Sequence, residues 1–268
     1  MTEQQKASPR GPLSPDLVIV HGMWSTPDTL AELREQFEQQ GYRVHTPALP
    51  FHRSRGDMDA TAQEGLKKSG VAHYVAAVEE LVNGLTQPPV LIGHSMGGLI
   101  AQLVAQKVAV ERLVLLSSAA PAGINAWCWS AIRTLGHNLF KFPLWTSLTD
   151  LRPANIRYGI ANTQTPELQD RIYQQSTYES GLASFQIAMW FLFSKPHTRL
   201  DPQAILCPVL LMGGVEDRIT PIASQRKIAR LYGDRATLVE LPGVCHWTIG
   251  GHAVEKIASD IGQWLNRT

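Results

Sequence analysis

The stretch GHSMGG at residues 93–98 places one serine among glycines, directly after the apolar run PPVLI. This spacing fits a sharp turn from a strand into a helix, in which the serine takes a strained backbone conformation with positive φ. Gly93 and Gly97 are then the positions that must be small, so that strand and helix avoid a clash, and Gly98 permits still closer packing. Such a turn exposes the hydroxyl at the positive end of the helix, where a developing oxyanion is favoured. The pattern predicts that Ser95 is a nucleophile, and a serine that only caps a helix is the alternative.

A serine hydroxyl becomes a good nucleophile only when a base takes its proton. Among the nine histidines, His246 is best placed for this role, because LPGVCHWTIG follows the last predicted strand and precedes the last predicted helix. An imidazole base needs an acid that holds its tautomer and stabilises the imidazolium. Asp217, in the loop GGVEDRITP, is expected to be that acid, and Glu216 is the alternative. The loop after the fourth predicted strand, SSAAP, offers no carboxylate.

An oxyanion formed by such chemistry needs two backbone N–H donors. Met96, the residue after the nucleophile, is expected to supply one of them. The loop VIVHGMW is expected to supply the other from Met23, with Gly22 allowing a close approach of the backbone. His21 is expected to support this loop by hydrogen bonds rather than to act as the base.

Short apolar runs alternate with amphipathic stretches, which is typical of a doubly wound, mostly parallel α/β sheet. The predicted strands lie at 16–22, 42–49, 88–95, 111–119, 207–214 and 235–243. The predicted helices lie at 26–41, 71–85, 97–108, 221–233 and 252–267. The first helix has Thr26 as its possible cap, Pro27 in its first turn and Gly41 at its end.

Residues 121–200 interrupt this alternation. They contain no clear strand and hold 12 of the chain's 20 aromatic residues. We expect a mostly helical insertion here, with the α/β core formed by residues 16–120 and 201–268. Residues 1–15 are polar and proline-rich without an apolar stretch, so they are expected to be a disordered lead rather than a signal peptide.

Composition excludes several classes of function. The net charge of +1 gives no electrostatic reason to expect nucleic acid or an acidic membrane as partner. No apolar run is long enough to span a bilayer. The three cysteines, Cys128, Cys207 and Cys245, lack metal-ligand spacing, which predicts no disulfide framework, no metal site and a cytoplasmic location. No organic cofactor is implied, and the sequence leaves the oligomeric state open.

The motifs HGMW, GHSMGG, GGVEDRITP and GVCHW together resemble the α/β-hydrolase superfamily, over residues 16–120 and 201–266. The resemblance implies a sheet that begins at the third strand of the eight-stranded version, and catalytic groups in the order Ser95, Asp217, His246. It also implies that the aromatic insertion is a cap domain above the active site.

One loop departs from the family pattern. LPFHRSRGDMD, after the second predicted strand, lacks the usual PGHG form. The cluster of His52, Arg53 and Arg55 is expected to be solvated, and a contact with an anionic or polar substrate group is the alternative.

The residue at the nucleophile position narrows the reaction. Dehalogenases and epoxide hydrolases of this superfamily use an aspartate there, so Ser95 argues against both. We expect a serine esterase, or carboxylesterase, that cleaves a small-to-medium hydrophobic ester through an acyl-enzyme. A thioesterase or lactonase with the same triad is the alternative. A non-hydrolytic ligand-binding protein or a lyase on this scaffold is the alternative from another class. The candidate pocket residues are Trp24, Trp127, Trp129, Trp190 and Trp247, although many aromatic side chains of the insertion are expected only to pack it onto the core.

Overall fold

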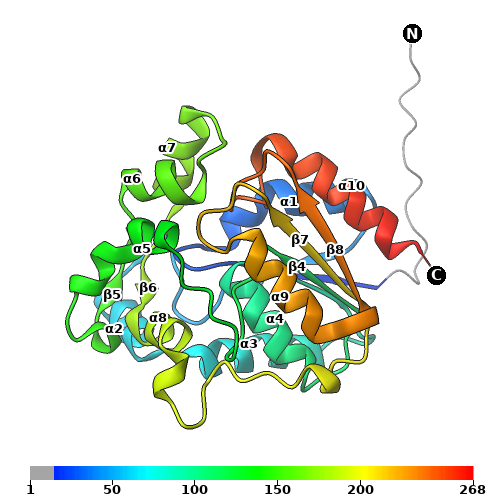
Figure 1. Cartoon of the computed structure of the whole chain (residues 1–268), viewed down its shortest axis with the longest axis horizontal. Helices are drawn as coiled ribbons and strands as arrows, with labels where there is room; N and C mark the ends of the chain where they lie inside the picture. The colour runs from blue at the N-terminus through cyan, green and yellow to red at the C-terminus, as the bar shows by residue number, and fades with distance from the viewer. Residues whose placement is uncertain (1–14, 268) are drawn as a thin grey trace.

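The computed structural model describes residues 15–267, apart from the side chain of Leu139. At its centre is a six-stranded sheet with the order β2-β1-β3-β4-β7-β8, in which every pair is parallel (Figure 1). The strands are β1 (Leu17–Val20), β2 (Val44–His45), β3 (Val90–His94), β4 (Arg112–Leu116), β7 (Val209–Gly214) and β8 (Ala236–Leu241). All six lie inside their predicted ranges, so the predicted fold class is confirmed. The lead predicted for 1–15 lies outside the described residues except for Pro15.

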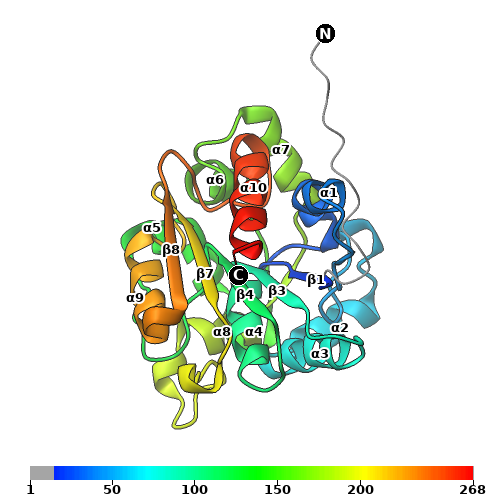
Figure 2. The same ribbon diagram turned by 90° about the vertical axis from the view of Figure 1, so that its right-hand side faces the viewer.

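The sheet is covered on both faces because its strands are apolar at successive positions. Leu17 and Ile19 pack on one side with α1 (Ala31–Gln39) and α10 (Val254–Leu265). Val18 and Val20 pack on the other side with α3 (Val71–Asn83), α4 (Met96–Ala105) and α9 (Ile222–Tyr232). Figure 2 shows the two groups of helices on opposite sides of the strands. Side chains of a strand alternate between its faces, so each strand contributes to both cores.

The predicted helices form, with two differences. A 3₁₀ turn, η1 (Pro27–Leu30), precedes α1, and the side chain of Thr26 makes no capping bond but donates to the carboxylate of Asp28. Thr26 therefore occupies the N-cap position, as predicted, but its side chain does not make the capping hydrogen bond. A helix that we did not predict, α2 (Ala60–Lys68), begins at Asp59, whose carboxylate accepts from the backbone N–H of Ala62.

The segment 121–200 folds into short helices with one small pair of strands. It enters after β4 and returns before β7. Its elements α5, β5, β6 and α8 lie on the side of the molecule away from α10, whereas α6 and α7 lie near the start of α10 (Figures 1 and 2). The sequence of this segment shows no clear strand, yet β5 (Leu148–Thr149) and β6 (Glu179–Ser180) pair antiparallel within it. The remaining elements are α5 (Trp129–Leu135), η3 (Gly136–Phe140), η4 (Leu144–Thr146), α6 (Pro153–Asn155), η5 (Ile156–Ile160), α7 (Pro166–Gln175), α8 (Gly181–Ala188) and η6 (Trp190–Leu192).

Four further short helical turns lie in the core part of the described chain: η2 (Arg55–Asp57), η7 (Pro202–Ala204), η8 (Gly233–Arg235) and η9 (Gly251–Ala253). The last of them, η9, leads into α10. Within the described residues, no helix combines the length and apolarity that a membrane span requires.

Candidate active site

Ser95 occupies the turn between β3 and α4 with φ 55° and ψ −120°. Its backbone N–H donates to the carbonyl of Leu116 in β4 at 3.0 Å, which fixes this strained conformation against the neighbouring strand. A Cβ atom at Gly93 would lie 2.2 Å from the carbonyl oxygen of Gly97, and one at Gly97 would lie 2.2 Å from that of Val20. The two glycines are therefore required by the close approach of α4 to β3 and β1.

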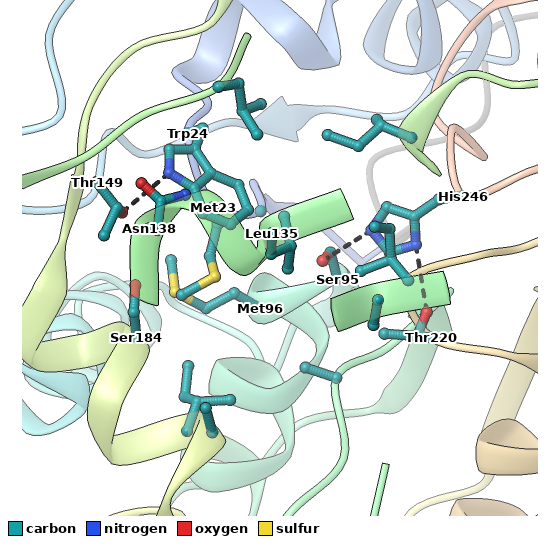
Figure 3. Close-up of a pocket in the computed structure, with 18 of the residues that line it drawn as sticks. Met23, Trp24, Ser95, Met96, Leu135, Asn138, Thr149, Ser184, Thr220 and His246 are labelled. Atoms are coloured by element: carbon teal, nitrogen blue, oxygen red, sulfur yellow. Dashed lines mark hydrogen bonds between the residues drawn. The ribbon is translucent and has the colours of Figure 1, made fainter. Parts of the chain in front are cut away.

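The structure brings Ser95, His246 and Asp217 together at the carboxyl ends of three strands. His246 Nε2 lies 2.9 Å from Ser95 Oγ (Figure 3), and its Nδ1 lies 2.8 Å from Asp217 Oδ2. Ser95 follows β3, Asp217 follows β7 and His246 follows β8. The alternative acid, Glu216, is exposed and does not contact the imidazole; its backbone carbonyl accepts from Asn162 instead.

Asp217 is held as a carboxylate. Burial alone would raise its pKa, but the neighbouring His246 and hydrogen bonds more than offset this effect, so the pKa lies below its usual value. Its Oδ1 accepts the backbone N–H groups of Ile219 and Thr220, each at 2.8 Å. An ionised Asp217 places the imidazole proton on Nδ1 and leaves Nε2 able to accept the proton of Ser95.

Two polar residues that contact this site, Thr220 and His94, were not predicted from the sequence. Thr220 Oγ1 lies 3.2 Å from His246 Nδ1 (Figure 3) and 2.9 Å from Asp217 Oδ2. His94 Nε2 lies 2.9 Å from the carbonyl oxygen of His246. Burial and the nearby His246 lower the pKa of His94 to about 3, so it is neutral and can donate that bond. The only available signal was position: Thr220 is three residues after Asp217, and His94 adjoins Ser95.

The backbone groups predicted to bind an oxyanion lie beside Ser95. Met96 is the first residue of α4, so its N–H has no partner within the helix. Met23 and Met96 both line the cavity next to Ser95 (Figure 3). A Cβ atom at Gly22 would lie 3.0 Å from that of Ser95, which explains why this loop carries a glycine.

His21 supports the same loop from behind. Its Nδ1 lies 2.9 Å from the carbonyl oxygen of Gly22, and its Nε2 accepts the backbone N–H of Leu49 at 3.2 Å. Burial, with a smaller effect of His52, lowers the pKa of His21 to about 3. His21 is thus a neutral residue that joins the loop after β1 to the loop after β2.

A cavity of about 230 Å³ adjoins Ser95 and His246. Of the predicted pocket residues, Trp24, Trp127, Trp190 and Trp247 line it. The prediction for Trp129 is wrong, because this residue begins α5 on the outside and is 75% exposed. Much of the remaining wall is aliphatic and was not predicted: Ile132, Leu135, Ile156, Ile160, Ile172 and Ile219.

His52 belongs to a buried network rather than to a solvated loop, so that prediction is wrong. Its Nε2 lies 3.0 Å from Glu179 Oε2 in β6, and the hydroxyl of Tyr74 in α3 donates to Glu179 Oε1 at 2.7 Å. Burial alone would lower the pKa of His52, but the carboxylate of Glu179 more than offsets this and raises it. The pair joins the core to the 121–200 segment.

The two arginines of that loop differ from each other. Arg55 donates from Nε to the carbonyl of Ser176 at 2.9 Å, and its guanidinium lies over the rings of Tyr173 and Tyr178. Arg53 is exposed and pairs with Asp59, as predicted for a solvated side chain. Neither arginine nor His52 is among the cavity-lining residues, so the suggested substrate contact is not supported.

Comparison with known proteins identifies the family. A model of the alpha/beta hydrolase family matches residues 17–259. The chain belongs to the α/β hydrolase family. A comparison with curated proteins finds no significant match.

Solved structures of other α/β hydrolases share the fold. An extracellular α/β-hydrolase from a Paenibacillus species superposes with a TM-score of 0.70 at 18% identity, over 93% of this chain and 98% of that one. A pyrethroid hydrolase from Sphingobium faniae gives 0.69 at 20% identity, over 94% and 98%. A monoacylglycerol lipase from Paleococcus ferrophilus gives 0.67 at 20% identity, over 94% and 95%.

Within the described residues, no group of three or more His, Cys, Asp or Glu side chains could hold a metal ion.

Proposed function

We propose that this α/β hydrolase cleaves small-to-medium hydrophobic carboxylic esters through an acyl-enzyme on Ser95. The observation that carries the proposal is the hydrogen-bonded chain from Asp217 through His246 to Ser95, which ends at an apolar cavity. An imidazole Nε2 at 2.9 Å from a serine hydroxyl, as in His246 and Ser95, is the geometry of a general base and its nucleophile.

The reaction begins when His246 Nε2 takes the proton of Ser95 as Oγ attacks the ester carbonyl carbon. The resulting oxyanion accepts hydrogen bonds from the backbone N–H groups of Met23 and Met96. The tetrahedral intermediate then expels the alcohol, which receives its proton from His246, and leaves an acyl group on Ser95. Water that loses a proton to His246 attacks this acyl group, and release of the acid restores the serine.

The cavity supports the choice of substrate. Its wall is largely aliphatic and aromatic, and no arginine or lysine lines it, so an uncharged apolar ester fits better than an anionic one. Segment 121–200 supplies residues of this wall such as Leu135, Ile156 and Trp190, and we assign it the role of a cap over the active site. Two solved structures of the same fold are named a pyrethroid hydrolase and a monoacylglycerol lipase, which is in keeping with a hydrolase.

The cysteines support an intracellular location. Cys128, Cys207 and Cys245 are free thiols, which are common in the reducing cytoplasm.

The decisive experiment is covalent labelling with a fluorophosphonate probe, together with ester hydrolysis. The wild type is expected to be labelled, and Ser95→Ala is expected to abolish labelling. Ser95→Ala and His246→Ala should each lower kcat by roughly a thousandfold or more. A panel of p-nitrophenyl esters of increasing chain length, with acyl thioesters and lactones beside them, ranks the substrate classes.

Three outcomes would contradict the proposal. An unlabelled, folded wild type argues for a binding protein. Hydrolysis that is unchanged in Ser95→Ala excludes the acyl-enzyme. Faster turnover of thioesters or lactones than of esters assigns the same triad to those substrates.

A further inference from the structure

The outer surface of the 121–200 segment carries a continuous row of aromatic rings. The ring centroids of Phe142 and Trp145 are 6.0 Å apart, and those of Trp145 and Phe185 are 5.1 Å apart. The row continues from Phe185 to Phe193 at 5.8 Å and from Phe193 to His197 at 5.2 Å. These rings come from η4 and the loop before it, from α8 and from the chain after η6, so three separate stretches build one surface.

This surface is exposed to an unusual degree. Phe140 and Phe142 are 90% and 85% exposed, and Phe191 and Leu192 are more than half exposed. Of the ten large hydrophobic side chains that are exposed in the described part of the chain, seven belong to the 121–200 segment. Exposed apolar side chains that cluster in this way mark a binding surface. We define the aromatic surface by its members: Phe140, Phe142, Trp145, Phe191, Leu192 and Phe193.

The two stretches that carry the aromatic surface have basic but no acidic side chains of their own. The stretches 121–149 and 181–200 contain no Asp or Glu, although the chain has 23 acidic residues, and they contain four Lys or Arg. Lys141 pairs with Asp150 from outside these stretches, and Arg133 lies over the ring of Tyr158. Lys195 and Arg199 are exposed on the same loop as Phe193. Exposed aromatic rings with nearby cations, on stretches that themselves contain no Asp or Glu, are complementary to an apolar layer with an anionic boundary.

The aromatic surface and the cavity share a wall. Trp190 lines the cavity and its ring lies 6.0 Å from that of Phe191. Trp127 also lines the cavity, and its Nε1 donates to the carbonyl of Ala188 at the end of α8. A molecule dissolved in an apolar layer at this surface would therefore be one layer of side chains from the cavity.

We propose that the aromatic surface docks onto an anionic lipid membrane, with its rings among the headgroups and Lys195 and Arg199 facing lipid phosphates. Tryptophan and phenylalanine favour this region of a bilayer because it accepts apolar rings beside polar groups. The surface lies on the opposite side of the molecule from α10, so docking leaves the rest of the fold in water (Figure 1). The net charge of +1 gave no sign of such a partner because it averages over the whole chain. Binding does not require hydrolysis, so this inference goes beyond the proposed function.

Vesicle co-sedimentation tests the proposal with two lipid mixtures, pure phosphatidylcholine and phosphatidylcholine with about one third phosphatidylglycerol. The wild type is expected to sediment with the anionic vesicles and more weakly with the neutral ones. The combined variant Phe140→Ser, Phe142→Ser, Phe191→Ser, Leu192→Ser should bind the anionic vesicles at least about tenfold more weakly than the wild type. The matched control is Leu206→Ser, which removes a side chain that is 82% exposed outside the aromatic surface and should leave binding unchanged.

A charge variant separates the contribution of the cations. Lys195→Glu with Arg199→Glu should reduce binding to the anionic vesicles and leave binding to the neutral ones nearly unchanged. Lys256→Glu, an exposed change on α10, is its control. None of the substituted residues lines the cavity, so hydrolysis of a dissolved ester should persist, and Ser95→Ala should still bind vesicles.

The proposal is overturned if the wild type stays in the supernatant, or if the serine variant binds as well as the wild type. It is also overturned if the wild type is a dimer that the serine variant dissociates, because a second copy then occupies the surface. A thermal melt of each variant verifies that it is folded. A wild type that binds vesicles but hydrolyses no ester contradicts only the proposed function.

Discussion

A single hydroxyl, that of Thr220, touches both residues that prepare Ser95 for attack. Its Oγ1 is within hydrogen-bonding distance of Asp217 Oδ2, His246 Nδ1 and, at 2.9 Å, the carbonyl oxygen of Ser117. Because the carbonyl of Ser117 belongs to the end of the sheet, Thr220 ties the Asp217–His246 pair to a rigid element. We assign Thr220 a positioning role rather than a catalytic one, since it does not touch Ser95.

Replacing Thr220 with valine keeps the shape of the side chain and removes its hydroxyl. We expect kcat to fall by about tenfold with KM nearly unchanged, because the imidazole loses orientation while the cavity stays intact. Steady-state kinetics on a dissolved ester measure both constants. Thr220→Ser, which retains the hydroxyl, should recover most of the rate. A serine variant as slow as the valine variant would show that the methyl group, not the hydroxyl, matters.

The structure brings together those candidate site residues whose positions chain order was enough to predict. Ser95, Asp217 and His246 each follow a recognisable strand, and parallel strands bring their carboxyl ends to one edge of the sheet. Thr220 and His94 both contact His246, which is 26 and 152 residues away from them in sequence, so no local pattern marks these contacts.

At the scale of elements, the 121–200 segment is held to the core on two sides. On one side, Glu179 of β6 pairs with His52 in the loop after β2. On the other, the side chain of Asn162 donates to the carbonyl of Glu216, and Arg218 donates to that of Tyr158. The second attachment involves the residues that flank Asp217. The loop that carries this acid therefore also contacts the segment that forms part of the cavity wall.

The His52–Glu179 pair should make the stability of the fold depend on pH. Because the folded pKa of His52 is raised above 6.5, its contribution is complete below pH 6.5 and is lost as the pH rises through the folded pKa. The melting temperature of the wild type should therefore exceed that of His52→Gln most at pH 6, with a gap that narrows toward pH 9. Differential scanning fluorimetry measures this gap. Arg53→Gln, an exposed neighbouring change, is the control, and a gap that does not vary with pH would refute the role of the pair.

Elements were predictable where apolar patterning is strong and not elsewhere. The four central strands are buried apolar runs with a clear signal, and the two edge strands, β2 and β8, are mostly half-buried. In contrast, α2 has the polar sequence ATAQEGLKK and shows little apolar periodicity. The strands β5 and β6 are two residues each, and contacts between distant parts of the chain, not local propensity, decide that they pair. Residue type alone suggested Trp129 for the pocket, but it could not show which face of α5 turns inward.

For the molecule as a whole, two buried neutral histidines set its response to acid. His21 and His94 both have pKa values lowered to about 3 by burial, while in an unfolded chain they titrate near 6.5. Unfolding therefore takes up protons between these values, and the stability contributed by each residue is lost as the pH falls from 6.5. The pKa of His52 is shifted in the opposite direction, and the stability that His52 contributes changes above pH 6.5.

The free energy of unfolding should consequently fall as the pH is lowered from 7 to 5. Each neutral histidine contributes up to about 1.4 kcal/mol per pH unit at the lower end of this range. Urea denaturation at several pH values measures the slope. His94→Gln replaces a titrating group with an amide that can still donate to the carbonyl of His246, so its slope should be shallower. Equal slopes for the two proteins would mean that His94 is protonated in the folded state.

The direct pairing of β4 with β7 has a consequence for how such a protein can evolve. Leu113 lies opposite Val209 in the sheet, so the two strands meet although the whole 121–200 segment separates them in sequence. The segment is an insertion between two strands that pair directly, so the sheet is continuous without it. The free-energy cost of closing such an inserted loop grows only slowly with its length. Ser95, Asp217 and His246 all lie outside it. Insertions, deletions or exchange of this one stretch can therefore change the substrate range and the binding surface of the molecule, while the reacting groups are inherited unchanged.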